Sequence, residues 1–318
     1  MSGFALAPGV VAARRRARRF ERRVALATVI GPPLGGGVAL ALLIWGAALP
    51  PVVVALTAGF YVLTVLGVTV GFHRLYSHRA FATGRAVRAA LGIAGSMSAQ
   101  GPLLFWVATH RRHHAHSDQQ GDPHSPQVRA GRPGGALRGL WFAHIGWMFD
   151  HEPEDWSRHA RDVLRDPTAF WVTRWYLGWV LLGIALPAVL AGLAERSFQA
   201  AAMGALWAGL VRMFLVHHAT WSVNSLCHVL GGRPFATRDH SRNNAMVALL
   251  TFGEGWHNNH HAFPRSARHG LLSWQPDPSY WLIRLLERIG LVHQVRRPTA
   301  AAVRSQQQRG NTATGAPS

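Results

Sequence analysis

The chain has 318 residues, of which 49% are apolar and only 15% are charged, and its formal charge at pH 7 is +19. Soluble domains carry about 25% charged residues, so the composition indicates long apolar segments joined by polar ones. The positive charge does not favour a nucleic-acid-binding protein, because seven of the arginines lie in residues 14–23, just before the first apolar segment, where membrane lipid attracts them. The single cysteine excludes an intrachain disulfide and a cysteine-ligated iron–sulfur cluster.

The apolar segments predict four transmembrane helices in two hairpins. Residues 24–71 are almost uncharged and are roughly twice the ~20 residues that cross a bilayer, with a turn signal at 49–51. The expected spans are 25–48, 52–71, 169–193 and 198–222. Each hairpin returns the chain to its starting side, so the positive-inside rule places the polar segments in the cytoplasm.

The other segments flank these spans. We expect a basic cytoplasmic segment at 1–23, a single domain at 24–295 and a disordered polar tail at 296–318. Residues 86–108 are interrupted by Gly and Ser, and we interpret them as a helix in the membrane interface. In the second pair of spans, Arg174 and Arg212 are expected to extend toward the interface.

Three clusters of histidines follow the spans on this side and predict a metal site. The second and third clusters share a 0, +3, +4 spacing, which on a helix places three side chains within an arc of about 100°. The first pair is five residues apart, so a straight helix would splay it by about 140°; the two residues either serve different ions or lie where the turn unwinds. The eight residues are His73, His78, His110, His113, His114, His257, His260 and His261.

The number of imidazoles indicates two metal ions, because eight exceed the four positions of one zinc site. A single buried histidine is more often a hydrogen-bonded core residue than a ligand, but three clusters reverse that expectation. Imidazole suits iron, copper, nickel and zinc. Redox chemistry on an apolar substrate at the membrane surface is the hypothesis that follows.

The stretches "GFHRLYSHRAF", "HRRHH", "GDPHSP", "AHIGWM", "NSLCHVLGGRPF" and "GEGWHNNHHAFP" occur in this order between residues 65 and 292. They resemble the membrane fatty acid desaturases, and within them the acyl-CoA and acyl-lipid Δ9 branch. The resemblance implies an all-α integral membrane protein with four transmembrane helices and a cytoplasmic helical cap that holds a di-metal site. It further implies an oxidoreductase with two iron ions and dioxygen as co-substrate, which leaves a cis double bond in a saturated acyl chain.

The resemblance also implies site residues. The implied ligands are His73, His78, His110, His113, His114, His228, His257, His260 and His261. Of these, His228 rests on the "NS-x-x-H" element of the family alone, and Asn224 in that element is expected to hold a metal-bound water. Side chains that could orient the ligands are Asp118, Asp122, His124, His144 and Glu254. We expect His217 and His218 to be structural or to line a cavity, and His151, His159, His240, His269 and His293 to lie at the surface.

The implied partners are membrane lipid, a fatty acyl substrate and an external electron donor. The acyl carrier is CoA, a lipid or acyl-carrier protein; Ala108 and Thr109 replace the charged pair that animal enzymes carry, which does not favour CoA bound in the animal manner. Arg111, Arg112, Arg129 and Arg265 are candidates to contact the phosphate of a carrier. A ferredoxin or reductase is expected to supply electrons, because no cytochrome b5-like "HPGG" segment occurs in the sequence.

Two alternatives stay open. A di-iron membrane hydroxylase or monooxygenase uses similar histidine clusters, usually at other spacings. A non-catalytic metal-binding membrane protein, such as a transporter, is expected to place its ligands near the middle of its spans. We expect the bacterial plasma membrane as the location, with both termini and the metal site on the cytoplasmic face.

Overall fold

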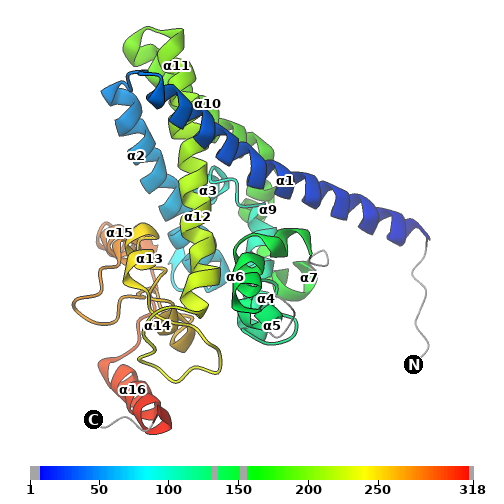
Figure 1. Cartoon of the computed structure of the whole chain (residues 1–318). Helices are drawn as coiled ribbons and strands as arrows, with labels where there is room; N and C mark the ends of the chain where they lie inside the picture. Colours follow the sequence, from blue (N-terminus) through cyan, green and yellow to red (C-terminus); the bar gives the residue numbers. More distant parts are fainter. Residues whose placement is uncertain (1–7, 131–134, 151–155, 315–318) are drawn as a thin grey trace.

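The computed structural model describes residues 8–130, 135–150 and 156–314, and in these ranges the chain is mostly helical (Figure 1). Its α-helices are α1 (Pro8–Ile44), α2 (Pro51–Leu66), α3 (Arg85–Ser96), α4 (Leu103–His116), α5 (Pro126–Ala130), α6 (Gly135–His144), α7 (Trp156–His159), α8 (Arg161–Leu164), α9 (Pro167–Arg174), α10 (Tyr176–Glu195), α11 (Phe198–Gly204), α12 (Arg212–Ser225), α13 (Ala245–Leu250), α14 (His257–Ala262), α15 (Pro278–Arg288) and α16 (Ala300–Thr314). The π-helices are η1 (Gly67–Ser77) and η3 (Ala205–Val211), and the 3-10 helices are η2 (Gly146–Phe149) and η4 (Leu226–His228). Strands β1 (Ala82–Thr83) and β2 (Val292–His293) form an antiparallel pair, with Ala82 opposite His293.

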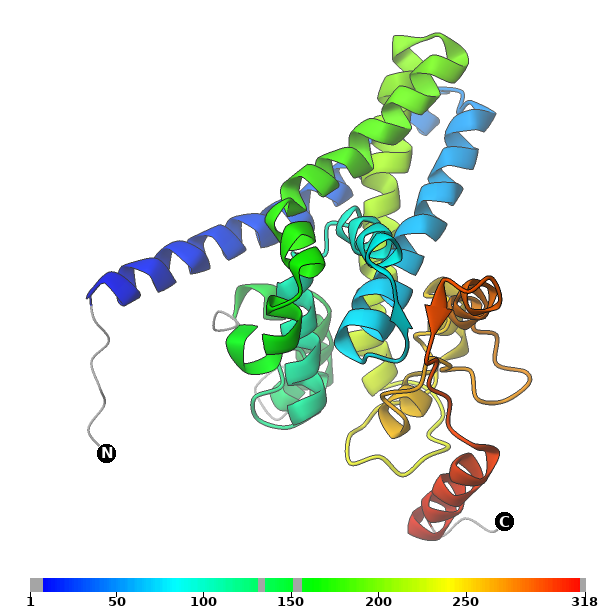
Figure 2. The ribbon, with the colours of Figure 1, turned by 180° about the vertical axis from the view of Figure 1, so that it is seen from behind.

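Four helical segments are long and apolar enough to cross a membrane, as the sequence predicts. They are Glu21–Ile44, Pro51–Ser77, Tyr176–Glu195 and Phe198–His228. The third begins later than the predicted residue 169, because α9 ends at Arg174 and α10 starts a separate helix at Tyr176. In both views the apolar helices extend to one end of the molecule, and the elements that carry the histidines gather at the other (Figure 2).

The segment predicted as one interfacial helix at 86–108 consists of two helices. Helix α3 ends at Ser96, and α4 begins at Leu103. Between them, Ala99 and Gly101 have φ angles of +60° and +94°, which glycine adopts readily and other residues seldom do. The turn is held by the Gly101 N–H, which donates to the Tyr176 hydroxyl at 3.0 Å.

Two further expectations differ from the structure. Arg212 does not extend toward the interface; it is fully buried, and its guanidinium donates to the carbonyl oxygens of Met97 at 2.7 Å and Gly183 at 2.6 Å. These bonds satisfy carbonyls that would otherwise be unpaired between packed helices. In the segment expected to be disordered, Ala300–Thr314 forms α16, where alanine, arginine and glutamine favour a helix.

Helix η1 packs against α3 through two glycines. A side chain at Gly67 would bring its Cβ within 2.2 Å of the Gly95 nitrogen, so only a residue without a side chain permits this approach. Helix η1 also contributes Val70, Phe72 and Leu75 to the main hydrophobic core, which includes Leu104 of α4. The core therefore fixes η1 relative to the helix that carries the second histidine cluster.

Candidate metal centre

The first histidine pair lies at the end of the second span, where the helix widens into a π-helix. A π-helix bonds each residue to the fifth before it, and the His78 N–H donates to the His73 carbonyl at 3.1 Å. Residues five apart therefore lie nearly above one another instead of being splayed as on a straight α-helix. The unwound turn that the spacing left open is observed, and it brings both imidazoles to one site.

The second and third clusters lie on short helices, as their spacing predicts. Helix α4 carries the second cluster in its last turns, and α14 consists almost entirely of the third. Together with the first pair and His228, they converge into two groups whose ligand nitrogens lie within 4.8 Å of one another. The first group is His73, His78, His110, His114 and His260; the second is His113, His228, His257 and His261.

Both groups fit a bound cation. In the first group, the Nε2 atom of His260 lies 3.1 Å from that of His73 and 2.9 Å from that of His114. In the second, His228 Nε2 and His257 Nε2 are 3.0 Å apart. Since His73 and His228 donate from Nδ1 to carboxylates, their Nε2 atoms carry lone pairs that point into the site, where a bound cation would accept them.

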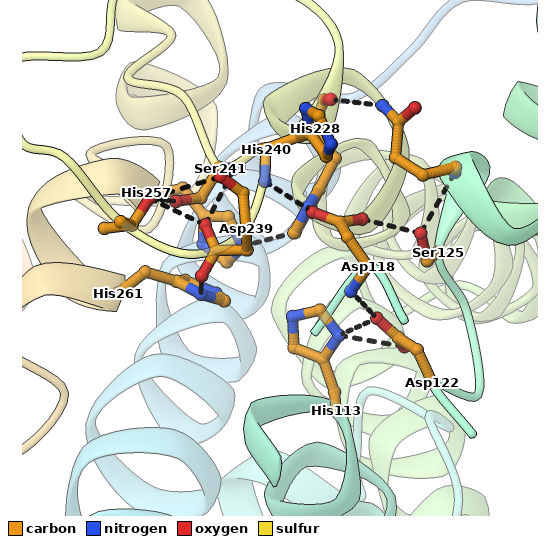
Figure 3. A network of polar contacts seen from close by, with 12 residues as sticks. His113, Asp118, Asp122, Ser125, His228, Asp239, His240, Ser241, His257 and His261 are labelled. Atoms are coloured by element: carbon orange, nitrogen blue, oxygen red, sulfur yellow. Dashed lines mark hydrogen bonds and ion pairs between the residues drawn. The ribbon is translucent and has the colours of Figure 1, made fainter. Parts of the chain in front are cut away.

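Carboxylates hold the second group from outside (Figure 3). Asp122 lies 2.9 Å from His113 Nδ1, Asp118 lies 2.8 Å from His228 Nδ1, and Asp239 lies 2.8 Å from His261 Nδ1. Each contact places the proton on Nδ1 and leaves Nε2 free to bind a metal, and it raises the basicity of the ligand. Asp118 and Asp122 thus contact histidines of the second group, and so does Asp239, a carboxylate that sequence reasoning missed.

The charge states of the site suit metal binding. Burial, together with repulsion from neighbouring histidines, holds the pKa of His110, His114, His257 and His260 well below the usual value, so these imidazoles are neutral at pH 7. Burial raises the pKa of Asp118, but the hydrogen bond from His228 and further donors outweigh it and bring the pKa to about 2. The carboxylate is therefore ionised at pH 7.

Glu254 links the first group to a buried arginine. It contacts His73 Nδ1 and, at 3.1 Å, the guanidinium of Arg74. Arg74 is fully buried and also pairs with Asp277 at 2.9 Å. The predicted contact of Glu254 with a ligand is thus present, and a chain of opposite charges connects it to the start of α15.

His269 is not at the surface, contrary to expectation. It is buried, its ring lies 4.6 Å from that of His260, and its Nδ1 lies 3.2 Å from an Arg74 nitrogen. A guanidinium can only donate, so His269 Nδ1 accepts and the ring proton lies on Nε2. This assignment makes His269 a buried neighbour of the first group, close to His73 and Glu254.

Other predicted residues lie at the edge of the site or away from it. His124 is buried and stacks on His113, with ring centroids 4.6 Å apart. His144 instead bonds to Ser225 at 2.9 Å and His218 at 3.0 Å, so its contacts do not support a role in orienting a ligand. His217 donates from Nε2 to the Ser98 carbonyl at 2.7 Å, which agrees with a structural role. His240 and His293 are exposed, His159 is half-buried, and His151 lies outside the described residues.

The arginines beside the second cluster contact the protein itself. The Arg111 guanidinium donates to Asp162 and to the carbonyls of Tyr76 and Ser77. Arg112 donates to the Gly121 carbonyl at 2.8 Å. Arg111 therefore holds α4 against the end of η1, and the expectation that it meets a carrier phosphate is not supported.

An apolar cavity of about 260 Å³ leads to the site. Its wall includes Val24 and Thr28 of α1, Phe105 of α4 and Trp221 of α12. It also includes His110 of the first group and Asn224, the residue expected to hold a metal-bound water. A long apolar ligand in this cavity would therefore approach the histidines with its chain.

Comparison with known proteins agrees with this geometry. The fatty acid desaturase family matches residues 47–277. The chain is 45% identical, over 86% of its length and 85% of the relative, to the hex-5-enoyl-[acyl-carrier protein] acetylenase of Moorena producens. It is 38% identical to the sn-1 stearoyl-lipid 9-desaturase of Anabaena variabilis, over 74% of the chain and 81% of the relative, and 38% identical to the acyl-CoA C20 Delta5-desaturase of Anemone leveillei, over 74% and 70%. The chain belongs to the fatty acid desaturase family.

Proposed function

We propose that this protein inserts a cis double bond, at the Δ9 position, into a saturated fatty acyl chain, with dioxygen as oxidant and two electrons from an external donor. The observation that carries the proposal is the apolar cavity whose wall contains a histidine of the first group and Asn224. It would hold the methylene groups of an acyl chain next to His110 of the first group and Asn224. Iron bound by these groups would activate dioxygen to remove hydrogen from the chain.

The ligand sets follow from the two groups. Five histidines would hold one iron, and four would hold the other, with Asn224 as the partner of a water that completes the second site. The carboxylates behind the second group fix its tautomers before metal arrives. This arrangement lets the ligands bind without reorganising, which is what a metal site of defined geometry requires.

The cavity wall contains a set of hydrogen-bonded side chains that would influence which carbon–carbon bond is oxidised. The side-chain amide of Gln100 donates to the Thr220 hydroxyl at 3.0 Å, and its Oε1 atom lies 3.4 Å from Trp106 Nε1. All three residues line the cavity, and Trp106 stacks on His110 with ring centroids 5.1 Å apart. These side chains would contact the acyl chain beside His110, and the carbon held nearest the histidines would be the one oxidised, because positioning selects the bond.

A second product is favoured by one relative. The acetylenase of Moorena producens is named for action on an acyl chain that already carries a double bond and a carrier protein. An alkyne product on an acyl-carrier protein is therefore the second candidate for this chain. CoA and lipid are also candidate acyl carriers for this chain, because other relatives are named for acyl-lipid and acyl-CoA substrates.

We further place both termini and the histidine groups on the cytoplasmic face of a bacterial plasma membrane. The arginines of residues 14–23 lie before the first span, and positive flanks favour the cytoplasmic side. The first histidine pair ends the second span, and His228 ends the fourth, which is consistent with two hairpins. A membrane-impermeant thiol reagent applied to intact cells should leave a cysteine introduced at Ser305 unlabelled; labelling would contradict this orientation.

Analysis of fatty acids tests the proposal. The native chain and His110→Ala are produced in a bacterial host without its own Δ9 desaturase, together with a ferredoxin and its reductase. Gas chromatography–mass spectrometry after derivatisation of double bonds should show a new monoene from the native chain alone. An alkyne would favour the acetylenase, hydroxy acids would assign the chain to hydroxylase chemistry, and no product from an iron-loaded, reduced protein would contradict the proposal.

A further inference from the structure

Helix α15 has two apolar faces, and only one of them is covered. On the covered face Ile283 is fully buried, and Ser279 bonds to Thr69 of η1 at 2.7 Å. On the other face Trp281, Leu285 and Ile289 are 60%, 54% and 60% exposed. A spacing of four residues places these three side chains within about 80° of the helix circumference. Exposure of a second apolar stripe to water is unfavourable, so this face of the helix is expected to be covered.

More exposed apolar side chains lie on neighbouring segments of the cap. Met246 and Leu249 of α13 are exposed, as is Trp274 in the loop before α15. The Ser279 N–H donates to the Phe252 carbonyl at 3.2 Å, which joins the start of α15 to the segment after α13. We call the side chains Met246, Leu249, Trp274, Trp281, Leu285 and Ile289 the cap anchor.

The cap anchor lies beside the second span. Tyr61, inside the second span, donates from its hydroxyl to the Leu250 carbonyl at 2.7 Å, and its ring contacts that of Phe252. The neighbouring Val62 and Leu63 of α2 are themselves exposed. Figure 1 shows α13 and α15 beside the lower end of α2. The exposed apolar surface of the second span therefore continues onto the cap.

We propose that the cap anchor inserts into the lipid headgroup region, so that α13 and α15 form an in-plane membrane anchor. Tryptophan prefers this region because its ring is apolar and its N–H needs a partner. Arg288 lies next to the stripe on α15, where it suits anionic headgroups, whereas Arg284 pairs with Glu287. A second copy of the chain is the other occupant that an apolar face admits, but the continuity with a span favours lipid.

The anchor is connected to the metal centre. The Trp274 ring lies 5.4 Å from that of Trp256, which directly precedes the third histidine cluster. Asp277 caps α15 by accepting from the Tyr280 N–H at 3.0 Å and pairs with Arg74. Lipid contact at the anchor would thus hold the third cluster at a fixed height above the spans, independently of whether the enzyme makes an alkene or an alkyne.

Site-specific fluorescence tests the anchor. The sequence contains one cysteine, Cys227, which is fully buried, so a thiol-reactive dye reports on a single introduced cysteine. Leu285→Cys and Trp281→Cys are labelled in the full chain in bilayers of phosphatidylcholine and phosphatidylglycerol. Ser305→Cys on α16 is the control, because it is exposed and α16 lies far from the apolar helices (Figure 1).

The expected result is strong quenching of both anchor labels by a lipid spin-labelled near its headgroup, and quenching by aqueous iodide several-fold weaker than at Ser305. Iodide quenching as strong as at Ser305 would overturn the proposal. Protection from iodide without quenching by the spin-labelled lipid would also overturn it and would assign the face to a second copy of the chain.

Discussion

The substitution Asp118→Asn tests how carboxylates prepare the metal centre. The Asp118 side chain accepts from His228 Nδ1 at 2.8 Å, from the Ser125 hydroxyl at 2.6 Å and from the His240 N–H at 2.7 Å. Asparagine has the same shape but one acceptor oxygen and no charge. Its oxygen can take the place of Oδ2 and still accept from His228 and His240, but the negative charge is lost. The neutral amide therefore holds the proton on His228 Nδ1 less firmly and makes Nε2 a weaker metal ligand.

The size of the effect follows from similar contacts. Removing the partner of a metal-bound histidine lowers metal affinity or activity by roughly 10–100-fold, which corresponds to ~1.4–2.8 kcal/mol. Asp118 contacts the second group, whereas Glu254 contacts the first. At limiting Fe²⁺, the iron content of the variant should therefore fall from about two to about one per chain, and product formation should fall with it.

Iron titration followed by mass spectrometry of metal content measures this loss. Ser125→Ala is the matched control, because it removes a donor to the same carboxylate and leaves the contact with His228 intact. The control should bind both irons as the native chain does. If Asp118→Asn also titrates like the native chain, the carboxylate does not prepare the ligand and the reasoning is wrong.

Two further predictions concern stability. Gly67→Ala should lower the free energy of unfolding by about 1–3 kcal/mol, measured by thermal unfolding in detergent, because its Cβ would meet Gly95; Gly59→Ala, with nothing within 4 Å, should not. Burial raises the pKa of Asp162, but the hydrogen bond and charge of Arg111 lower it from 3.8 to about 2. Its contribution of about 1–2 kcal/mol is then full above pH 4 and is lost as the pH falls through 2, so the stability difference between the native chain and Asp162→Asn should shrink over that range; a constant difference would contradict this.

Local patterns predicted the parts of the site that depend on local structure. The 0, +3, +4 spacing of the second and third clusters is a property of one helix, so α4 and α14 could be expected from the letters alone. The lengths of the apolar segments predicted four spans for the same reason. The π-helix around His73 remained one of two alternatives. No local signal distinguishes a widened helix that brings His73 and His78 to one ion from a straight helix whose two histidines bind different ions.

The residues that were missed act over long distances in the sequence. Asp239 contacts His261 from a loop, and His269 contacts Arg74 across 195 residues. Nothing in "RDH" or "ARHG" marks these residues as inward-facing, because their burial follows from how loops fold over the histidines. One signal in the sequence could have indicated Asp239. The chain has only 14 acidic residues, so each of them is a candidate to contact one of the many histidines.

The distribution of these carboxylates makes the two sites unequal. Among the described residues, three of the four histidines in the second group contact an aspartate through Nδ1, whereas in the first group Glu254 contacts His73. A carboxylate bonded to Nδ1 makes the Nε2 atom of an imidazole a stronger metal ligand, so the second group should bind iron more tightly than the first. Stepwise chelation should therefore remove the first iron from the five-histidine group, leaving a one-iron form whose remaining metal is lost earlier in Asp118→Asn than in the native chain. Simultaneous loss of both irons from the native chain would show that the carboxylates do not separate the two affinities.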